Sequence, residues 1–184
     1  MNTDRNLGAE ANPEEKEVLT LLHVAACEGK SDVILFLLDH RHDVNEATNK
    51  GMTPLHSCAI GDRKEATKVL LENGANPNLK NFLGGVPLIY TALKDHVETA
   101  RVLLKKGANP NIPDNKGSTA LHVAAEKGAC KVVKLLLANG ANALMKNDDG
   151  NTPLDGATAE AAKILRRHLA KKKTQVKLPP SSNN

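Results

Sequence analysis

The apolar positions of the chain recur with a single period. A four-residue phrase with a leucine at its third position returns every 33 residues. Its five copies are Thr20-Leu21-Leu22-His23, Thr53-Pro54-Leu55-His56, Val86-Pro87-Leu88-Ile89, Thr119-Ala120-Leu121-His122 and Thr152-Pro153-Leu154-Asp155. A fixed period of this length marks a stack of small units that bury their apolar faces against one another. The sequence therefore predicts a repeat fold.

Each copy of the phrase predicts the start of a helix. Threonine is a good N-cap because its hydroxyl accepts from a free amide of the first turn, and proline suits the next position, where no amide partner is lost. Apolar and alanine positions follow at helical spacing, as in Leu121, Ala124 and Ala125. A second apolar stripe, which includes Val132 and Leu136 in the fourth unit, predicts a second helix. Each unit thus reads as two helices joined by a turn.

The second helix of each unit has a defined stop signal. Gly74, Gly107 and Gly140 stand where a helix would end in a left-handed residue. Arg41 takes that place in the first unit. A positive φ there costs on the order of 1 kcal/mol relative to glycine. We therefore expect a distorted turn or a frayed helix end after the first unit.

The recurring residues together resemble the ankyrin repeat family. Glycines stand two positions before the phrase, Leu pairs close the second helix, and Gly-Ala-Asn turns follow. These residues are Gly51, Gly84, Gly117 and Gly150, then Leu70-Leu71, Leu103-Leu104 and Leu136-Leu137, then Gly74-Ala75-Asn76, Gly107-Ala108-Asn109 and Gly140-Ala141-Asn142. The resemblance implies an all-α, right-handed solenoid of helix-turn-helix units joined by β-hairpin-like loops. It contains five repeats, the last of them truncated.

The repeat register also predicts the domain boundaries. We expect a flexible N-terminus over residues 1–12 and a repeat domain over 13–170, with units at about 13–48, 49–81, 82–114, 115–147 and 148–170. Asn12-Pro13-Glu14-Glu15 reads as an N-cap, a first-turn proline and two acids that favour the helix dipole, and so as a solvated cap on the first repeat. Residues 171–184 form a basic, then Pro/Ser/Asn-rich tail that we expect to be disordered.

The net charge of +4 is concentrated at the C-terminus. Residues 1–30 hold six acids and three bases, and residues 160–184 hold seven bases and one acid, so the central body is close to neutral. Aromatic residues make up 2% of the chain, which leaves little for base stacking. Nucleic acid, anionic lipid or an import receptor would therefore meet only the basic tail. The alternative is a solvated helix end whose lysines favour the dipole.

Composition also bears on the cellular environment. No apolar run approaches the 18 or so residues that cross a membrane, and acids stand where a signal peptide has its apolar core. We expect a soluble protein of the cytoplasm or nucleus. Cys27, Cys58 and Cys130 fall in three different units without metal-type spacing, so ordinary reduced thiols are expected.

The histidines of the phrase invite a catalytic or metal assignment, but the period argues against it. His23, His56 and His122 lie at the same level of different units, so they do not converge on one ion. The chain has neither a nucleophile elbow nor a phosphate-binding loop. We expect no enzyme activity, cofactor, metal or small-molecule substrate. The family resemblance implies that these histidines bond to the threonines and to adjacent loops.

The positions at which the units differ are the candidates for function. The resemblance implies a monomeric protein-binding module that contacts an unidentified protein through its loop tips and the exposed side of each first helix. The candidate contact residues are Lys50, Met52, Ile60, Phe82, Leu83, Tyr90, Leu93, Lys94, Lys116 and Glu126. Phe82 and Leu83 occupy a tip where other units carry Asn, Lys or Asp. They predict an apolar strip rimmed by lysines. Alternatively, both fold over the neighbouring loops and Leu93 is core.

Two further deviations accompany this strip. The third unit has Val86 and Ile89 where others have Thr and His, which indicates either apolar substitution for hydrogen bonds or adjustment to a partner. Asn45, in Asp43-Val44-Asn45 after Leu37, resembles the ankyrin pattern accepted by asparaginyl hydroxylases. Its alternative role is to tie the loop, as we expect of Asn78 and Asn111.

Overall fold

The computed structural model describes residues 18–176, which form four helix pairs followed by one long helix. The N-terminal segment, its Asn12–Glu15 cap and the end of the tail lie outside this range. The helices are α1 (Leu21–Glu28), α2 (Ser31–Asp39), α3 (Pro54–Gly61), α4 (Lys64–Glu72), α5 (Pro87–Lys94), α6 (Val97–Lys105), α7 (Ala120–Lys127), α8 (Cys130–Ala138) and α9 (Ala159–Val176). The first four pairs keep the 33-residue offset.

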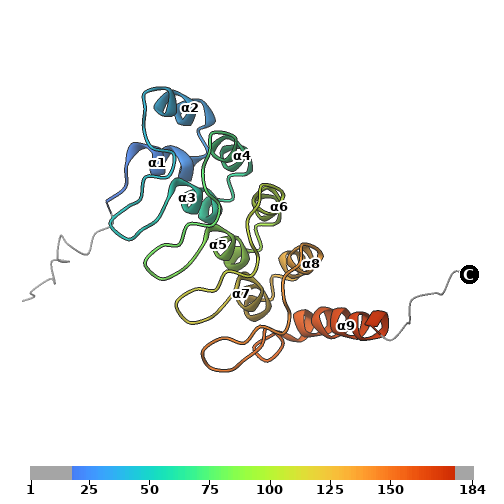
Figure 1. Ribbon diagram of the computed structural model, residues 1–184. Coiled ribbons are helices and arrows are strands. Elements are labelled where there is room, and N and C mark those ends of the chain that lie inside the picture. The colour runs from blue at the N-terminus through green and yellow to red at the C-terminus, as the bar shows by residue number, and fades with distance from the viewer. Residues whose placement is uncertain (1–17, 177–184) are drawn as a thin grey trace, which may run out of the picture.

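The helices stack in two rows (Figure 1). The first helices α1, α3, α5 and α7 form one row, and α2, α4, α6 and α8 form the second. The long loops project from the side of the first row. Each pair packs on its neighbours in sequence, so the core runs along a line. The all-α repeat solenoid implied by the family resemblance is confirmed. No helix in the described part of the chain is both long and apolar enough to span a bilayer.

The leucine of each phrase forms the spine of the core. Leu22, Leu55, Leu88 and Leu121 are all fully buried. Burial of a leucine side chain contributes about 1.5–3 kcal/mol. Cys58 lies among them, and burial raises the pKa of its thiol to about 12. This cysteine therefore acts as a small apolar residue of the core.

The loops are hairpin-like and are joined to one another at their tips. Within a tip the chain closes on itself, as where Asn81 N donates to Gly85 O at 2.9 Å. Between tips, Phe82 N donates to Lys50 O and Asn115 N donates to Leu83 O, both at 3.1 Å. The tips are therefore held in a row.

Arg41 adopts the conformation that glycine has in the other units. Its φ is 65°, and His42 N donates to Leu37 O at 3.2 Å, as Ala75 N donates to Leu70 O at 3.0 Å. A side chain at the equivalent Gly74 would meet no atom within 4 Å. The expectation of a distorted turn or frayed helix is wrong, because the turn has room for a side chain and only the backbone strain remains.

The fifth phrase does not open a helix, contrary to the sequence prediction. Residues 153–156 form a turn, in which Thr152 N and Oγ1 both donate to Asp155 Oδ2 at 2.7 Å. Gly156 follows, and glycine is a poor helix former. The shortened unit instead places Thr158 N on Ala125 O at 3.1 Å and begins α9 directly afterwards. Helix α9 continues past residue 170, where the domain boundary was expected.

Candidate functional site

The histidines of the phrase tie each first helix to the following loop. Thr53 N donates to His56 Nδ1 at 3.0 Å, and His56 Nε2 lies 3.0 Å from Gly85 O. His23 Nε2 and His122 Nε2 make the same link, to Met52 O at 2.8 Å and to Asn151 O at 3.1 Å. Burial lowers the pKa of His56 to about 4. The network implied by the family resemblance is confirmed, and its role is structural. Among residues 18–176, no group of three His, Cys, Asp or Glu side chains could hold a metal ion.

The third unit replaces this link by apolar packing. Val86 and Ile89 are both buried in the core. The loop that follows keeps the contacts within its own tip, where Asp114 Oδ1 accepts from Lys116 N and Ser118 N, both at 2.9 Å. Apolar substitution therefore accounts for this exception without a partner.

Phe82 and Leu83 are the most exposed large apolar side chains in the described part of the chain, at 71% and 74%. The Phe82 ring rests on the preceding tip, because a β-carbon added at Gly51 would lie 2.8 Å from Phe82 Cδ1. Most of the ring nevertheless stays open to solvent. The two interpretations from the sequence thus each describe part of the arrangement.

A groove of about 440 Å³ lies between the second and third tips. Its lining residues are Lys50, Met52, Asn81, Phe82, Leu83 and Tyr90. Met52 is only 9% exposed, and its sulfur accepts a hydrogen bond from Asn81 Nδ2 at 3.0 Å. Met52 therefore forms the floor of this groove. Tyr90 is half-buried, and its ring forms a T-shaped pair with that of His56 at a centroid distance of 5.6 Å. Met52 therefore contributes to the candidate contact surface from the floor of the groove and not as an exposed side chain.

Asn81 organises the groove, and the sequence reading missed it. Its Oδ1 accepts from Leu83 N at 3.0 Å and from Gly85 N at 2.9 Å, and its Nδ2 donates to the Tyr90 hydroxyl. The side chain is buried. The period contained the signal, since Thr48, Asp114 and Asn147 occupy the same position and are all polar.

The remaining candidates lie along the inner helices and neighbouring tips. Ile60, Leu93 and Glu126 hold the same position in successive first helices, and all three are exposed. Leu93 is therefore not core. Lys94 and Lys116 are exposed too, and Glu126 pairs with Lys127 at 2.8 Å. None of these residues lines the groove. The candidates therefore fall into two sets, the residues that line the groove and a row along the first helices that contains Ile60, Leu93 and Glu126.

The asparagines after each second helix tie successive units. Asn45 Oδ1 accepts from Asn76 N at 2.8 Å, and Asn78 Oδ1 accepts from Asn109 N at 2.8 Å. Leu144 breaks the series and is exposed. The tethering role expected of Asn45 is confirmed.

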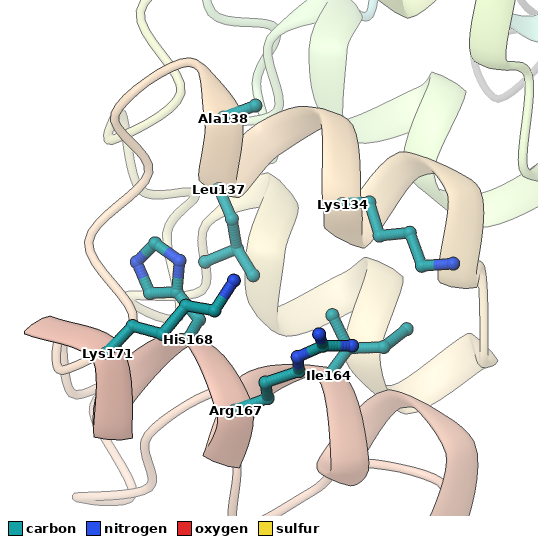
Figure 2. Close-up of a pocket in the computed structure, with 7 residues that line it drawn as sticks. All are labelled: Lys134, Leu137, Ala138, Ile164, Arg167, His168 and Lys171. Carbon is teal, nitrogen blue, oxygen red and sulfur yellow. The ribbon is translucent and has the colours of Figure 1, made fainter.

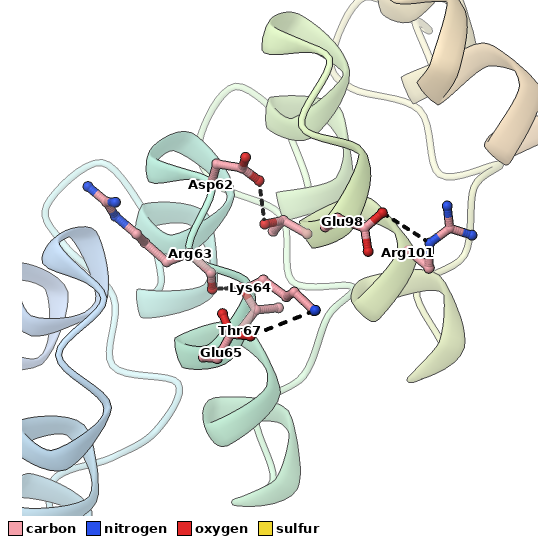
Figure 3. A network of polar contacts seen from close by, with 8 residues as sticks. Asp62, Arg63, Lys64, Glu65, Thr67, Glu98 and Arg101 are labelled. Carbon is pink, nitrogen blue, oxygen red and sulfur yellow. Dashed lines mark hydrogen bonds and ion pairs between the residues drawn. The ribbon is translucent and has the colours of Figure 1, made fainter.

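Figure 3 shows polar contacts near the start of α4 and on α6 that stabilise the stack. Asp62, with a φ of 53°, accepts from Thr99 Oγ1 at 2.7 Å and so links the second unit to the third. The nearby Glu98–Arg101 pair, at 3.4 Å, is largely exposed. Exposed pairs of this kind contribute about 0–1 kcal/mol.

A second concave region lies between α8 and α9 (Figure 2). It has a volume of about 440 Å³ and an apolar floor of Leu137, Ala138 and Ile164. Its rim carries Lys134 from α8 and Arg167, His168 and Lys171 from α9.

The cations of this rim are uncompensated. No acidic group within residues 18–176 lies at ion-pair distance from Lys134, Arg167 or Lys171. Burial lowers the pKa of His168, and the positive charges of Lys172 and Lys171 lower it further. This end of the stack therefore has a positive local potential.

Comparison with known families agrees with the repeat geometry. A model described as ankyrin repeats (3 copies) matches residues 4–81, and one described as ankyrin repeats (many copies) matches residues 92–157. The chain belongs to the ankyrin repeat family. Proteins of this class are generally protein–protein interaction modules and typically lack enzyme activity. A search among curated proteins finds no match to the chain.

Proposed function

We propose that this chain is a non-enzymatic protein-binding module whose contact surface centres on the groove between the second and third loop tips. The observation that carries the proposal is the exposure of Phe82 and Leu83 on a tip that is hydrogen-bonded to both neighbouring tips. A pre-ordered apolar surface loses little conformational entropy on binding, so modest contacts give useful affinity.

The surroundings of the groove define the partner's chemistry. Lys50 borders Phe82 and Leu83, and Lys116 lies on the next tip. A partner segment with apolar side chains flanked by Asp or Glu would fill the groove and meet these lysines. The row of Ile60 and Leu93 extends the apolar contact along the inner helices. Lys94 and Glu126 border that row and favour polar contacts at its edge.

Paired truncation of the tip tests the proposal. Phe82→Ala with Leu83→Ala is expected to abolish capture of the protein that the wild-type chain retains from a cell lysate, because truncation of such anchors costs about 2 kcal/mol or more each. Tyr90 is a poorer target than the sequence suggested, since its hydroxyl bonds Asn81, which holds the tip.

The matched control is Leu144→Ala, which removes an exposed leucine from another link. It should leave capture intact. Helical content by circular dichroism should not change in either variant. Capture that survives the paired truncation would remove the groove from consideration.

A second candidate function is the binding of an anionic partner by α9 while the repeats hold a protein. The uncompensated Lys134, Arg167 and Lys171 around an apolar floor favour it over a merely solvated helix end. Nucleic acid, anionic lipid and an acidic receptor surface share this chemistry.

Removal of positive charge from the rim tests whether the rim binds anionic partners. Arg167→Gln with Lys171→Gln should weaken binding to duplex DNA or to phosphatidylserine vesicles in a salt-dependent way. Lys163→Gln is the control, because Lys163 already pairs with Glu160 at 2.6 Å. Equal binding by both variants, or no binding of either probe by the wild-type chain, would exclude the rim as a site for these anions.

A further inference from the structure

The first repeat exposes apolar side chains at positions that are buried or half-buried in the other repeats. Leu21 is 68% exposed, Phe36 is 60% exposed, and Val24 and Val33 are each 41% exposed. One period later, the residues equivalent to Leu21, Val24 and Val33 are Pro54, Ser57 and Ala66, and all three are buried. We call Leu21, Val24, Val33 and Phe36 the open face.

Hydrogen bonds in the later units show what covers these positions. Arg63 Nε donates to Cys27 O at 2.8 Å, and the equivalent His96 Nδ1 lies 3.0 Å from Ala59 O. Thr99, equivalent to Val33, donates to Asp62 at 2.7 Å. Each of these bonds reaches the preceding unit. The open face is thus the stacking surface of the first repeat, left without a neighbour within residues 18–176.

The opposite end of the stack is finished differently. Along α9, Glu160, Lys163, Arg166 and Arg167 are exposed, whereas Ala161 and Leu165 face inward and are buried. Terminal units with a polar outer face are what a repeat stack needs for solubility. The C-terminal end meets this condition and the open face does not.

The chain's own N-terminal residues are poorly suited to cover the open face. Residues 1–17 contain two large apolar side chains, Met1 and Leu7, against five acids. Covering four large apolar side chains requires a comparably apolar surface. A second copy of the open face has that composition, and Lys30 and Asp32 beside it carry opposite charges.

The exposed area suits such a pairing. Val18 and Leu19, which precede the open face in sequence, are also exposed. These six side chains together present on the order of 600 Å² per copy. Two copies would then bury roughly 1,200 Å², which is the lower limit for a stable specific interface.

We propose that two copies of this chain associate head to head through their open faces. A two-fold axis brings Phe36 and Leu21 of one copy against the same patch of the other, as in any isologous interface. The two grooves between the loop tips stay free, and the dimer presents both of them to partners.

Sedimentation of the full chain tests the pairing. The wild-type protein is expected to dimerise with a dissociation constant in the micromolar range, and Phe36→Asp to weaken dimerisation by about 100-fold or more. Phe82→Asp is the matched control, because Phe82 is similarly exposed but lies on a loop tip. It should leave the dimer unchanged.

Two results would overturn the proposal. One is a wild-type chain that stays monomeric at about 100 µM. The other is equal dissociation by Phe36→Asp and Phe82→Asp. If Phe36→Asp lowers helical content, Leu21→Gln replaces it, with the same expected shift to monomer.

Discussion

Acidification should weaken the stack at one identifiable residue, His56. The backbone amide of Thr53 donates to Nδ1, so Nδ1 is an acceptor and the ring proton resides on Nε2, which donates to Gly85 O. A proton added at Nδ1 would remove this acceptor and leave the Thr53 amide without its partner. The neutral ring is therefore the form that the folded chain holds.

The size of the effect follows from the pKa. Burial lowers the pKa of His56 from 6.5 to about 4, with a smaller contribution from His23 in the same direction. The unfolded chain therefore binds this proton more readily than the folded chain. Above pH 6.5 neither state is protonated and stability is unaffected. As the pH falls from 6.5 to about 4, the free energy of unfolding decreases by roughly 3 kcal/mol.

Urea unfolding followed by circular dichroism at pH 7.5 and pH 4 measures this loss. Carboxylates titrate over part of the same range, so the test compares two proteins. Thr53→Val with His56→Ile copies the Val86 and Ile89 pair of the third unit, which is buried in the same register. The variant should lose less stability on acidification than the wild-type chain, by roughly 3 kcal/mol. An identical acid dependence of the two proteins would refute the argument.

Three further outcomes are expected. Gly84→Ala should destabilise the chain more than Gly74→Ala. Both glycines have positive φ, but a β-carbon at Gly84 would lie 2.5 Å from the backbone nitrogen of Asn115, whereas one at Gly74 would meet open space. Equal unfolding midpoints would contradict this. Arg41→Gly should stabilise by about 0.5–1 kcal/mol by relieving its positive φ, and thermal unfolding checks it. After treatment with an asparaginyl hydroxylase, peptide mass analysis should show no added oxygen on Asn45, because its side chain holds the Asn76 amide; a gain of one oxygen would contradict a purely tethering role.

The 33-residue period predicted a repeat fold, and the family resemblance supplied its architecture. The period located the starts of α3, α5 and α7, because the effects of proline, threonine and leucine on the backbone are local. It also located the turns, because the backbone preference of glycine is local too. It failed at Arg41 and at the fifth phrase. The outcome at Arg41 depended on the free space around the turn, and at the fifth phrase on how a shortened unit packs against α7. Neither is a local property of the sequence.

The candidate site was predictable only in part. Deviation from the repeat pattern singled out Phe82 and Leu83, and both are exposed. The burial of Met52 and the link from Asn81 to Tyr90 arise from contacts between successive loops, which repeat spacing does not define. The open face required both kinds of information. The register shows which positions should be covered, and the structure shows that these are not.

Photo-crosslinking from the loop tip shows whether a partner protein contacts the groove. A photoreactive phenylalanine derivative in place of Phe82 should yield a covalent adduct with one protein in a cell lysate, because that side chain borders the proposed contact surface. The same derivative in place of the exposed Leu144 serves as the comparison. The adduct is expected at position 82 and not at position 144. No adduct at 82, or the same adduct at both positions, would contradict it.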